Sequence, residues 1–513
     1  MTRKQLVLLV LTLIALIPVL LSLIASINQP QIQANLQLYQ TNLVLQASEF
    51  SEQIFQENNP NVNIELGEIM TALIGKNVSK NALKQYQEAR QLSQNNLDNL
   101  ENQLQVINPN YSVSNTLISS PNPKQLNEKI NKQREAINEL DLKLGILEAQ
   151  EGNTSQSLTT WNNLQSTSLK NITDVVIGLW SPTYRIYPES ELIINDNLKG
   201  WFRYRILKEL YQIEDRQSDL IDLKQKEQQI AIYSLKKLIL VSIIPLFLGI
   251  IGFGLFLFLM FQLVIKKEQS ILFIGQELSW KTPWNFETIL QVLIVGFFFF
   301  GQIVLPVLFG FLNIDISYLS LRGKAIYVLA SYLSLSLGGL VVLYISIKPF
   351  FPLPKDWFKF ELNKGIVWGI SGYLVALPLV VLISLINQQI WNGQGGSNPL
   401  LSLALESQDK IVLAIFYITA AIAAPVYEEI MFRGFLLPSL TRYVPVWGAI
   451  VISSLIFALA HLNLSEVLPL AVLGIVLGTV YTRSRNLLSS MLLHSLWNSG
   501  TLFSLFLLGS GGN

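Results

Sequence analysis

The residues best suited to chemistry lie in the last hundred positions of the chain. Two adjacent carboxylates, Glu428 and Glu429, open the stretch EEIMFR, and Arg433 closes it. In a helix, Glu429 and Arg433 stand four residues apart, so they share a face and can pair. Glu428 points about 100° away from that face and keeps a free carboxylate. The spacing therefore predicts one acid held in a structural ion pair and a second acid available for proton transfer.

The chain has only two histidines, and each stands at helical spacing from a partner residue. His461 ends the stretch FALAH, four residues after Phe457, and His494 opens the stretch HSLWN, four residues before Asn498. A carboxylate and an imidazole can hold and deprotonate a water molecule. A second imidazole and a carboxamide can donate hydrogen bonds to the oxyanion of a tetrahedral intermediate. Together with Glu428, these residues predict water-driven hydrolysis of an amide.

A divalent metal is a second interpretation of the same side chains. Zinc accepts nitrogen and oxygen ligands, and catalytic zinc sites combine three protein ligands with a water molecule. Glu428, His461 and His494 could supply those ligands, but the histidines do not stand in H-E-x-x-H spacing. The chain has no cysteine, which excludes thiol catalysis and Cys-ligated zinc. No cofactor is therefore certain, and a metal-free or weakly metal-assisted glutamate mechanism is favoured over tightly bound zinc.

Each motif taken singly also has a structural interpretation. An ion pair of Glu429 with Arg433 near a helix end is most often structural, and a lone histidine in an apolar helix is more often a packing residue. Asn498 by itself is ordinary interhelical hydrogen bonding, and Gly474 with Gly478 predicts a close helix contact. The functional interpretation rests on the joint pattern, because ionisable groups inside lipid cost about 2.5–3.5 kcal/mol each.

The elements that must position these residues are transmembrane helices. Hydrophobic residues make up 50% of the chain and charged residues 14%, against roughly 25% charged in an average soluble domain. The sequence predicts an all-α polytopic transmembrane bundle of about nine spans, eight of them in the core. The expected spans are 5–27, 238–265, 288–312, 325–347, 366–390, 411–437, 445–461, 467–483 and 487–508.

Between the first span and the core lies a region of a different kind. Residues 28–236 are rich in polar residues, with apolar residues at helical spacing, which predicts an α-helical domain inserted between an anchor at 1–27 and a membrane domain at 237–513. A tetratricopeptide-like helix pair around Trp161 is one interpretation, and a helical-hairpin domain of no special type is favoured because no 34-residue period is found. One amphipathic or coiled-coil stripe, interrupted only at Gln133, consists of Leu126, Ile130, Ile137, Leu140, Leu144 and Leu147.

Lysine and arginine in the short loops predict the orientation. With a cytoplasmic N-terminus, thirteen such residues fall on the cytoplasmic side and three in the short outer loops. We therefore expect an integral, multi-pass membrane protein with residues 28–236 outside the cytoplasm and an uncleaved first span. The net charge of +1 and the absence of a basic patch exclude nucleic acid as a partner. The sequence names no partner for the 28–236 domain.

The predicted spans leave one inconsistency in depth. At 1.5 Å per residue, Glu428 lies about 14 Å and His494 about 10 Å from the cytoplasmic ends of their helices, whereas His461 lies about 24 Å deep. Side chains of one site need similar depths. The helix over 445–461 must therefore start deeper, tilt strongly, or have other bounds.

The three motifs, each on its own predicted helix, resemble the signature of the CPBP (CAAX protease and bacteriocin-processing) intramembrane proteases, relatives of the type II CAAX prenyl endopeptidases. E-E-x-x-x-R, F-x-x-x-H and H-x-x-x-N occur here without departures and in the same order. The resemblance covers roughly 238–508 and is most secure over 400–508, where the Asn398-Pro399-Leu400 entry is also typical.

The resemblance implies roles for the motif residues. Glu428 and His461 would activate the water, His494 and Asn498 would form the oxyanion hole, and Glu429 with Arg433, supported by Phe457, would fix the site. The substrate would be a membrane-embedded or lipidated protein or peptide in the bilayer, with a prenylated CAAX protein as one case. The alternative is a non-catalytic membrane scaffold or bacteriocin self-immunity protein. A transporter ranks last, because no internal symmetry or paired broken helices are found.

Overall fold

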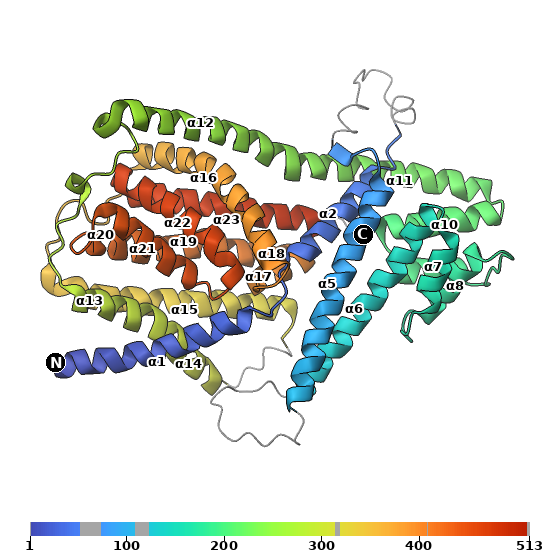
Figure 1. Ribbon diagram of the computed structural model, residues 1–513, viewed down its shortest axis with the longest axis horizontal. Helices are drawn as coiled ribbons and strands as arrows, with labels where there is room; N and C mark the ends of the chain where they lie inside the picture. The colour runs from blue at the N-terminus through green and yellow to red at the C-terminus, as the bar shows by residue number, and fades with distance from the viewer. Residues whose placement is uncertain (1, 52–72, 108–122, 313–318, 408, 510–513) are drawn as a thin grey trace. The chain divides into compact units, whose positions relative to one another are not determined.

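The chain folds into helices that form two compact units. The computed structural model describes residues 2–51, 73–107, 123–312, 319–407 and 409–509. Every regular element within these ranges is a helix, which confirms the all-α prediction (Figure 1). The membrane unit comprises Met1–Gln31 and Ile244–Phe506, and the helical unit comprises Ile32–Ile243 and Leu507–Asn513.

The membrane unit is built from long apolar helices joined by short connections. Eight helical stretches of the described chain are long and apolar enough to cross a membrane, which confirms a polytopic bundle. The elements of this unit are α1 (Arg3–Ser26), α12 (Ile244–Lys266), η2 (Lys267–Gln269), η3 (Gln276–Leu278), α13 (Phe286–Leu290), η4 (Gln291–Val304), α14 (Leu305–Phe311), α15 (Leu321–Ile347), η6 (Lys348–Phe350), α16 (Leu362–Trp391), α17 (Pro399–Glu406), α18 (Lys410–Tyr417), η7 (Ile418–Ala423), α19 (Ala424–Glu429), η8 (Ile430–Leu436), α20 (Leu437–Leu440), α21 (Val446–Leu459), α22 (Leu464–Ser484) and α23 (Leu487–Gly509).

One predicted span is too short to cross a bilayer. Helix α21 has 14 residues, which gives it a length of about 21 Å against a hydrocarbon core of about 30 Å. The prediction of about nine spans is therefore one too high. Its cause is that the apolar stretch from 445 to 461 ends in a turn, so that His461 lies beyond the helix and not deep within it.

Helices α21 and α22 pack closely where glycine replaces a side chain. A Cβ atom added to Gly474 would come within 2.8 Å of the Ser454 Cβ, and one added to Gly478 within 3.1 Å of Ile450. Small residues allow helices in a membrane to approach at their backbones. The predicted small-residue contact is thus confirmed, and it brings the backbone of α22 next to the helix that carries Phe457.

The helical unit is a separate bundle with its own core. Its helices α5 and α6 lie against each other as a long hairpin (Figure 1). The elements of this unit are α2 (Gln33–Ala47), α5 (Val78–Ile107), α6 (Pro123–Gln150), α7 (Thr154–Asn162), α8 (Lys170–Trp180), α9 (Ser190–Asn197), α10 (Gly200–Ile213), α11 (Gln217–Leu238) and η1 (Ile239–Ile243).

The predicted apolar stripe of α6 is buried along its whole length. All six of its apolar members are less than a tenth exposed. The polar residue that interrupts the stripe, Gln133, donates from Nε2 to the backbone carbonyl of Ser93 on α5 at 3.0 Å. Its amide is thereby satisfied within the helix interface, which explains how a polar residue is accommodated there.

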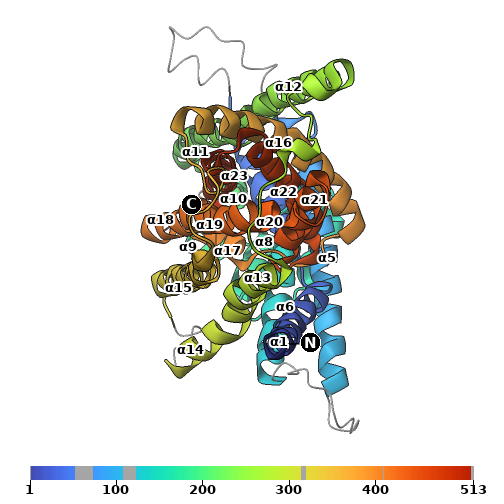
Figure 2. The ribbon, with the colours of Figure 1, turned by 90° about the vertical axis from the view of Figure 1, so that its left-hand side faces the viewer.

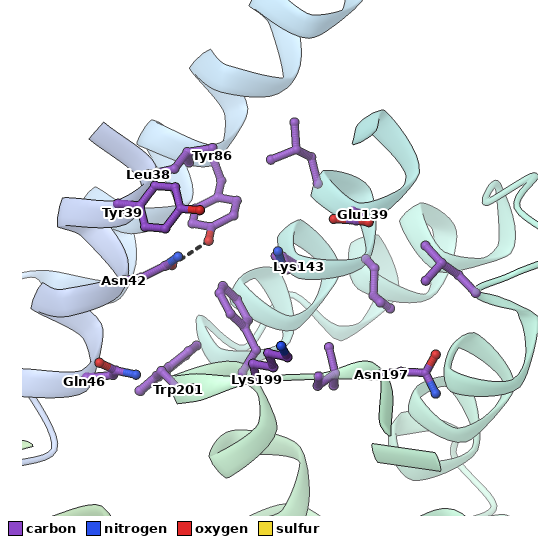
Figure 3. Close-up of a pocket in the computed structure, with 16 residues that line it drawn as sticks. Leu38, Tyr39, Asn42, Gln46, Tyr86, Glu139, Lys143, Asn197, Lys199 and Trp201 are labelled. Carbon is purple, nitrogen blue, oxygen red and sulfur yellow. Dashed lines mark hydrogen bonds between the residues drawn. The ribbon is translucent and has the colours of Figure 1, made fainter. Parts of the chain in front are cut away.

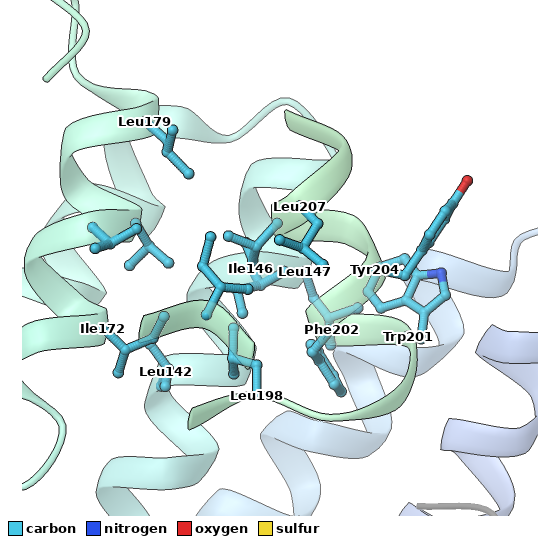
Figure 4. Packing of buried hydrophobic residues seen from close by; sticks show 14 of the residues in the cluster. Leu142, Ile146, Leu147, Ile172, Leu179, Leu198, Trp201, Phe202, Tyr204 and Leu207 are labelled. Atoms are coloured by element: carbon cyan, nitrogen blue, oxygen red, sulfur yellow. The ribbon is translucent and has the colours of Figure 1, made fainter. Parts of the chain in front are cut away.

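A tight contact joins α6 to α7 next to this stripe. The Trp161 indole donates from Nε1 to the Leu142 carbonyl at 3.1 Å, and a Cβ atom added to Gly145 would overlap the indole. Position 145 of α6 therefore has to be glycine, because the Trp161 indole of α7 lies directly against the backbone there. The continuous core beyond this contact is shown in Figure 4, where Ile146 and Leu147 of α6 meet Phe202 of α10.

Candidate active site

The three motifs lie on neighbouring helices of the membrane unit (Figure 2). Glu428 and Glu429 end α19, and Arg433 lies one turn later in η8, a stretch of wide π-helical turns. Phe457 lies near the end of α21, and His494 lies in α23. Wide helical turns of this kind are frequent at functional sites. The motifs that contain Phe457 and His494 are thus carried by helices that pack around the junction of α19 and η8.

The predicted pair of Glu429 and Arg433 is formed in the interior of the unit. Arg433 Nη1 lies 2.8 Å from Glu429 Oε1, and both side chains are fully buried. The same carboxylate oxygen lies 3.0 Å from His494 Nδ1, and Arg433 Nη2 donates to the Gly474 carbonyl at 3.2 Å. The arginine therefore neutralises Glu429, and Glu429 fixes the orientation of the His494 ring.

Glu428 has a different environment although it is the adjacent residue. Its Oε1 accepts a hydrogen bond from the Tyr332 hydroxyl of α15 at 2.8 Å. Its Oε2 is buried and accepts no hydrogen bond from any described residue. This oxygen lies 3.9 Å from His494 Nε2, and the side chain is 13% exposed. One oxygen is thus held by the protein, while the other remains open beside an imidazole.

Phe457 forms a common packing surface for the charged and aromatic groups of the site. The Arg433 guanidinium carbon lies 4.4 Å from the centre of its ring. The rings of His461 and His494 contact it edge to face at 5.0 and 5.7 Å between ring centroids. Such contacts supply cation–π and aromatic interactions as well as shape. The structural support expected of Phe457 therefore has a physical basis in three neighbours.

His461 lies in the turn after α21 and is only partly buried. Its Nδ1 lies 2.9 Å from the Phe457 carbonyl, which leaves Nε2 as the nitrogen available to a ligand. No hydrogen bond or ion pair between His461 and Glu428 is found in the described ranges. The structure thus brings Glu428 together with His494, while His461 adjoins them through the Phe457 ring.

The helix before the glutamates contains a proline that breaks its hydrogen-bond series. Pro425 has no backbone N–H to donate. In the wide turn before it, the N–H of Ala424 reaches back five residues to the Thr419 carbonyl. The next carbonyl in this series is that of Ala420, and its donor would be the missing N–H of Pro425. In a membrane-spanning helix, a carbonyl without its backbone donor requires a donor from elsewhere.

Two side chains of α23 donate to carbonyls of this stretch, and one of these carbonyls is that of Ala420. Asn498 Nδ2 donates to the Ala420 carbonyl at 2.7 Å, and the Ser495 hydroxyl donates to the neighbouring Ala421 carbonyl. One of the two amide hydrogens of Asn498 is therefore used to hold α23 against the α18–α19 stretch. The second remains for another acceptor.

Sequence reasoning missed two residues of this region, Tyr332 and Glu466. Tyr332 is one hydroxyl in the apolar run of α15, and no spacing pattern connects it with Glu428. Glu466 lies in the first turn of α22, near enough to interact electrostatically with His461. It accepts a hydrogen bond from the backbone N–H of Asn398 at 2.7 Å. An acidic residue directly before a predicted apolar span was the available signal for it.

The residues suggested for a metal do not form a metal site in this arrangement. No group of three or more His, Cys, Asp or Glu side chains that could hold a metal ion occurs in the part of the chain that the structure describes. Glu428, His461 and His494 therefore do not fit a three-ligand zinc site as they stand.

Comparison with known proteins supports the interpretation of the motifs. The family described as "Type II CAAX prenyl endopeptidase Rce1-like" matches residues 410–500, which contain all three motifs. The "Putative membrane peptidase YdiL" of Bacillus subtilis (strain 168) is 26% identical over 141 residues, 28% of this chain and 57% of that protein. The "Membrane-embedded CAAX protease MroQ" of Staphylococcus aureus (strain USA300) is 26% identical over 169 residues, 32% of this chain and 67% of that protein.

A third relative is matched over a larger share of its length. The "UPF0177 protein YxdF" of Lactococcus lactis subsp. lactis (strain IL1403) is 30% identical over 139 residues, 26% of this chain and 72% of that protein. No solved structure matches the chain. The relatives match about a third of the chain or less, and the family model matches residues that lie in the membrane unit. On this similarity and the intact motifs, the chain is a multi-pass membrane protein that belongs to the CPBP family, the family of the type II CAAX prenyl endopeptidases.

Proposed function

We propose that the chain is an intramembrane endopeptidase that hydrolyses a peptide bond with a water molecule activated by Glu428. The observation that carries this proposal is the open oxygen of Glu428, which lies buried beside His494 Nε2 at 3.9 Å. Two acceptors this close together can bind the same water molecule at hydrogen-bonding distance. With Nδ1–H directed at Glu429, the neutral His494 ring presents a lone pair on Nε2 to that water.

The positions of the groups support the following reaction. Glu428 takes a proton from the water as the water oxygen bonds to the carbonyl carbon, and the carbonyl electron pair moves onto its oxygen. When the C–N bond breaks, the leaving amine takes the proton back from Glu428. Glu429 holds the His494 ring, and Arg433 balances the charge of Glu429. The second amide hydrogen of Asn498 is the proposed donor to the oxyanion, whereas the neutral His461 ring, with Nδ1–H directed at the Phe457 carbonyl, presents a lone pair on Nε2.

The proposed substrate class and orientation are supported by the family and by the loops. The relatives' names describe a membrane peptidase and a membrane-embedded CAAX protease, which supports a membrane-embedded or lipidated protein or peptide as substrate. A prenylated CAAX protein is one member of that class. The distribution of lysine and arginine supports a cytoplasmic N-terminus and a helical unit outside the cytoplasm.

Replacement of the catalytic carboxylate tests the proposal. Glu428→Gln keeps the shape of the side chain and removes its basicity, so cleavage should fall by about a hundredfold or more. The measurement is a comparison of new protein termini in membranes from cells that produce the wild type or the variant. Glu268→Gln, at an exposed position of η2, is the matched control and should cleave like the wild type.

The same experiment separates the protease from the alternative scaffold or immunity function. Equal sets of termini for the wild type and Glu428→Gln, in a variant that still inserts and folds, would contradict proteolysis. A phenotype that persists in that variant would then favour the non-catalytic function.

A further inference from the structure

The helical unit contains a pocket that the membrane unit's chemistry does not explain. It is a cavity of about 510 Å³ between α2, α5, α6 and the start of α10, lined only by residues of this unit (Figure 3). This volume is within the range of about 300–1,000 Å³ that is usual for pockets that bind small ligands. The pocket therefore has the size of a ligand site, and its lining indicates what the ligand must offer.

Two lysines border the pocket, and neither has an acidic ion-pair partner among the described residues. Lys143 comes from the middle of α6 and Lys199 from the residue before α10 (Figure 3). Neither forms an ion pair with any residue that the structure describes. Burial lowers the pKa of Lys143, and the charge of Glu139 one turn earlier only partly opposes this. With Glu139 as the acidic residue of the lining, the pocket has an excess of one positive charge, which suits a ligand with one negative charge.

The start of α10 adds further donors to the same place. This helix has 14 residues, and its first backbone bond runs from the Arg203 N–H to the Lys199 carbonyl. No described side chain caps its N-terminus, and Gly200, Trp201 and Phe202 of its first turn line the pocket. The first N–H groups of a helix lack partners within the helix and attract anions. Gly200 has a φ of +56°, a conformation that glycine adopts without strain.

The remaining lining is apolar, with amide groups at its edge. The rings of Tyr86 and Phe202 meet edge to face at 5.5 Å between centroids, and the Phe202 ring centre lies 6.0 Å from Lys143 Nζ. The Tyr86 hydroxyl donates to Asn42 Oδ1 at 2.6 Å. The Asn42 amide nitrogen, with no partner of its own in the described chain, can donate to a ligand carbonyl. Leu140 and Leu198 complete the apolar wall.

We propose that this pocket binds the free carboxyl end of a peptide whose last side chain is apolar. The carboxylate lies between Lys143 and Lys199 near the first turn of α10, and the apolar side chain lies against Tyr86 and Phe202. Asn42 donates to a peptide carbonyl. A single carboxylate matches the excess of one positive charge, whereas a phosphate would bring close to two negative charges. The proposal is independent of catalysis in the membrane unit.

Calorimetric titration of the full chain in lipid nanodiscs tests the proposal. The probes are N-acetyl-Leu-Phe with a free carboxylate, the same dipeptide as its C-terminal amide, and octanoate, each corrected for binding to empty nanodiscs. The free acid should bind, and the amide should bind at least roughly tenfold more weakly, the effect of about 1.4 kcal/mol. Equal affinity for acid and amide, or no binding of the acid, would overturn the proposal. If octanoate bound as tightly as the peptide acid, the ligand class would be a fatty acid and not a peptide, and this result would also overturn the proposal.

Substitutions locate the binding within the pocket. Lys143→Met should weaken binding of the acid at least roughly tenfold and leave weak binding of the amide unchanged. Lys143→Arg should retain binding, and its circular dichroism spectrum shows whether the unit is folded. Lys132→Met, on the exposed face of the same helix, is the matched control and should bind like the wild type. Wild-type affinity in a folded Lys143→Met variant would contradict the assigned site.

Discussion

Adjacent glutamates acquire different chemistry in this protein because one residue step turns a helix by about 100°. Glu429 is directed into the interior, where Arg433 and His494 share one of its oxygens. Glu428 is directed towards Tyr332 and keeps one oxygen open. Removal of one member of a buried ion pair typically costs about 3–5 kcal/mol, so Glu429 and Arg433 hold each other in place. The free carboxylate beside them is thereby kept in a constant position.

Tyr332 should act as a positioning residue for Glu428. Tyr332→Phe keeps the ring but removes the donor to Oε1, so the carboxylate can rotate away from His494. We expect kcat to fall by about tenfold to a hundredfold, with KM little changed. Tyr327→Phe on the same helix is the control, because no hydrogen bond of its hydroxyl is found within the described ranges. An assay with a cleaved substrate gives both constants, and a fall in thermal stability without a fall in kcat would contradict the assigned role.

Residue-level prediction succeeded where the partners are neighbours along one helix. The pair of Glu429 and Arg433 follows directly from i, i+4 spacing. The contact of Tyr332 with Glu428 joins residues that are 96 positions apart on different helices. A single tyrosine in an apolar run carries no period that would reveal such a partner. The contact therefore required knowledge of how α15 packs.

At the scale of elements, Pro425 interrupts the backbone hydrogen-bond series of the α18–α20 stretch. This interruption explains why α23 carries polar side chains. Pro425 leaves the carbonyl of Ala420 without its backbone donor, and Asn498 donates to it at 2.7 Å. Asn498 thus forms an interhelical hydrogen bond, one of the two interpretations that the sequence offered for it, but the sequence did not reveal which carbonyl it serves. A backbone defect in one helix and its repair by another helix cannot be recognised from either segment alone.

This structural task predicts a coupling between Pro425 and Asn498. Asn498→Ala should lower the free energy of unfolding by about 1–3 kcal/mol, because a buried carbonyl loses its donor. In a Pro425→Ala background, the restored N–H can serve that carbonyl, so the same substitution should cost less. Thermal unfolding of the four proteins of this cycle in one detergent measures the coupling. Additive losses in the double variant would show that Asn498 does not compensate for the proline.

At the scale of the whole molecule, each of the two units is stabilised internally by a different kind of interaction. In the membrane unit, outward-facing apolar side chains contact lipid tails that are as apolar as they are, so the hydrophobic effect does not drive the helices together. The bundle is instead stabilised by close packing at Gly474 and Gly478 and by buried polar contacts. The helical unit buries its own apolar core, as in any domain surrounded by water. The predicted all-α class is confirmed in the described residues. The number of spans was overestimated, because hydropathy does not show where an apolar run such as 445–461 turns.

Lys143, a partly buried lysine of the helical unit, predicts how the stability of this unit depends on pH. Burial lowers the pKa of Lys143 in the folded state, while the unfolded chain keeps the usual value of about 10.4. Between these two values the unfolded state binds more protons than the folded state, so stability rises with pH in this window. Below the window Lys143 is charged in both states, and its burial is a constant cost. Lys143→Met removes that cost and should be more stable than the wild type at neutral pH.

Hydrogen exchange of the α6 amides measures this difference, because two proteins compared at the same pH share their intrinsic exchange rates. The methionine variant should exchange more slowly at pH 7, by about tenfold for each pKa unit by which the lysine is depressed. Its advantage should shrink as the pH approaches 10, where the folded lysine is neutral. The raised pKa of Tyr86 lowers stability only above about pH 10 and acts in both proteins. An advantage that grows with pH would show that Lys143 is stabilised as a cation, and would place a negative charge beside it in the empty pocket.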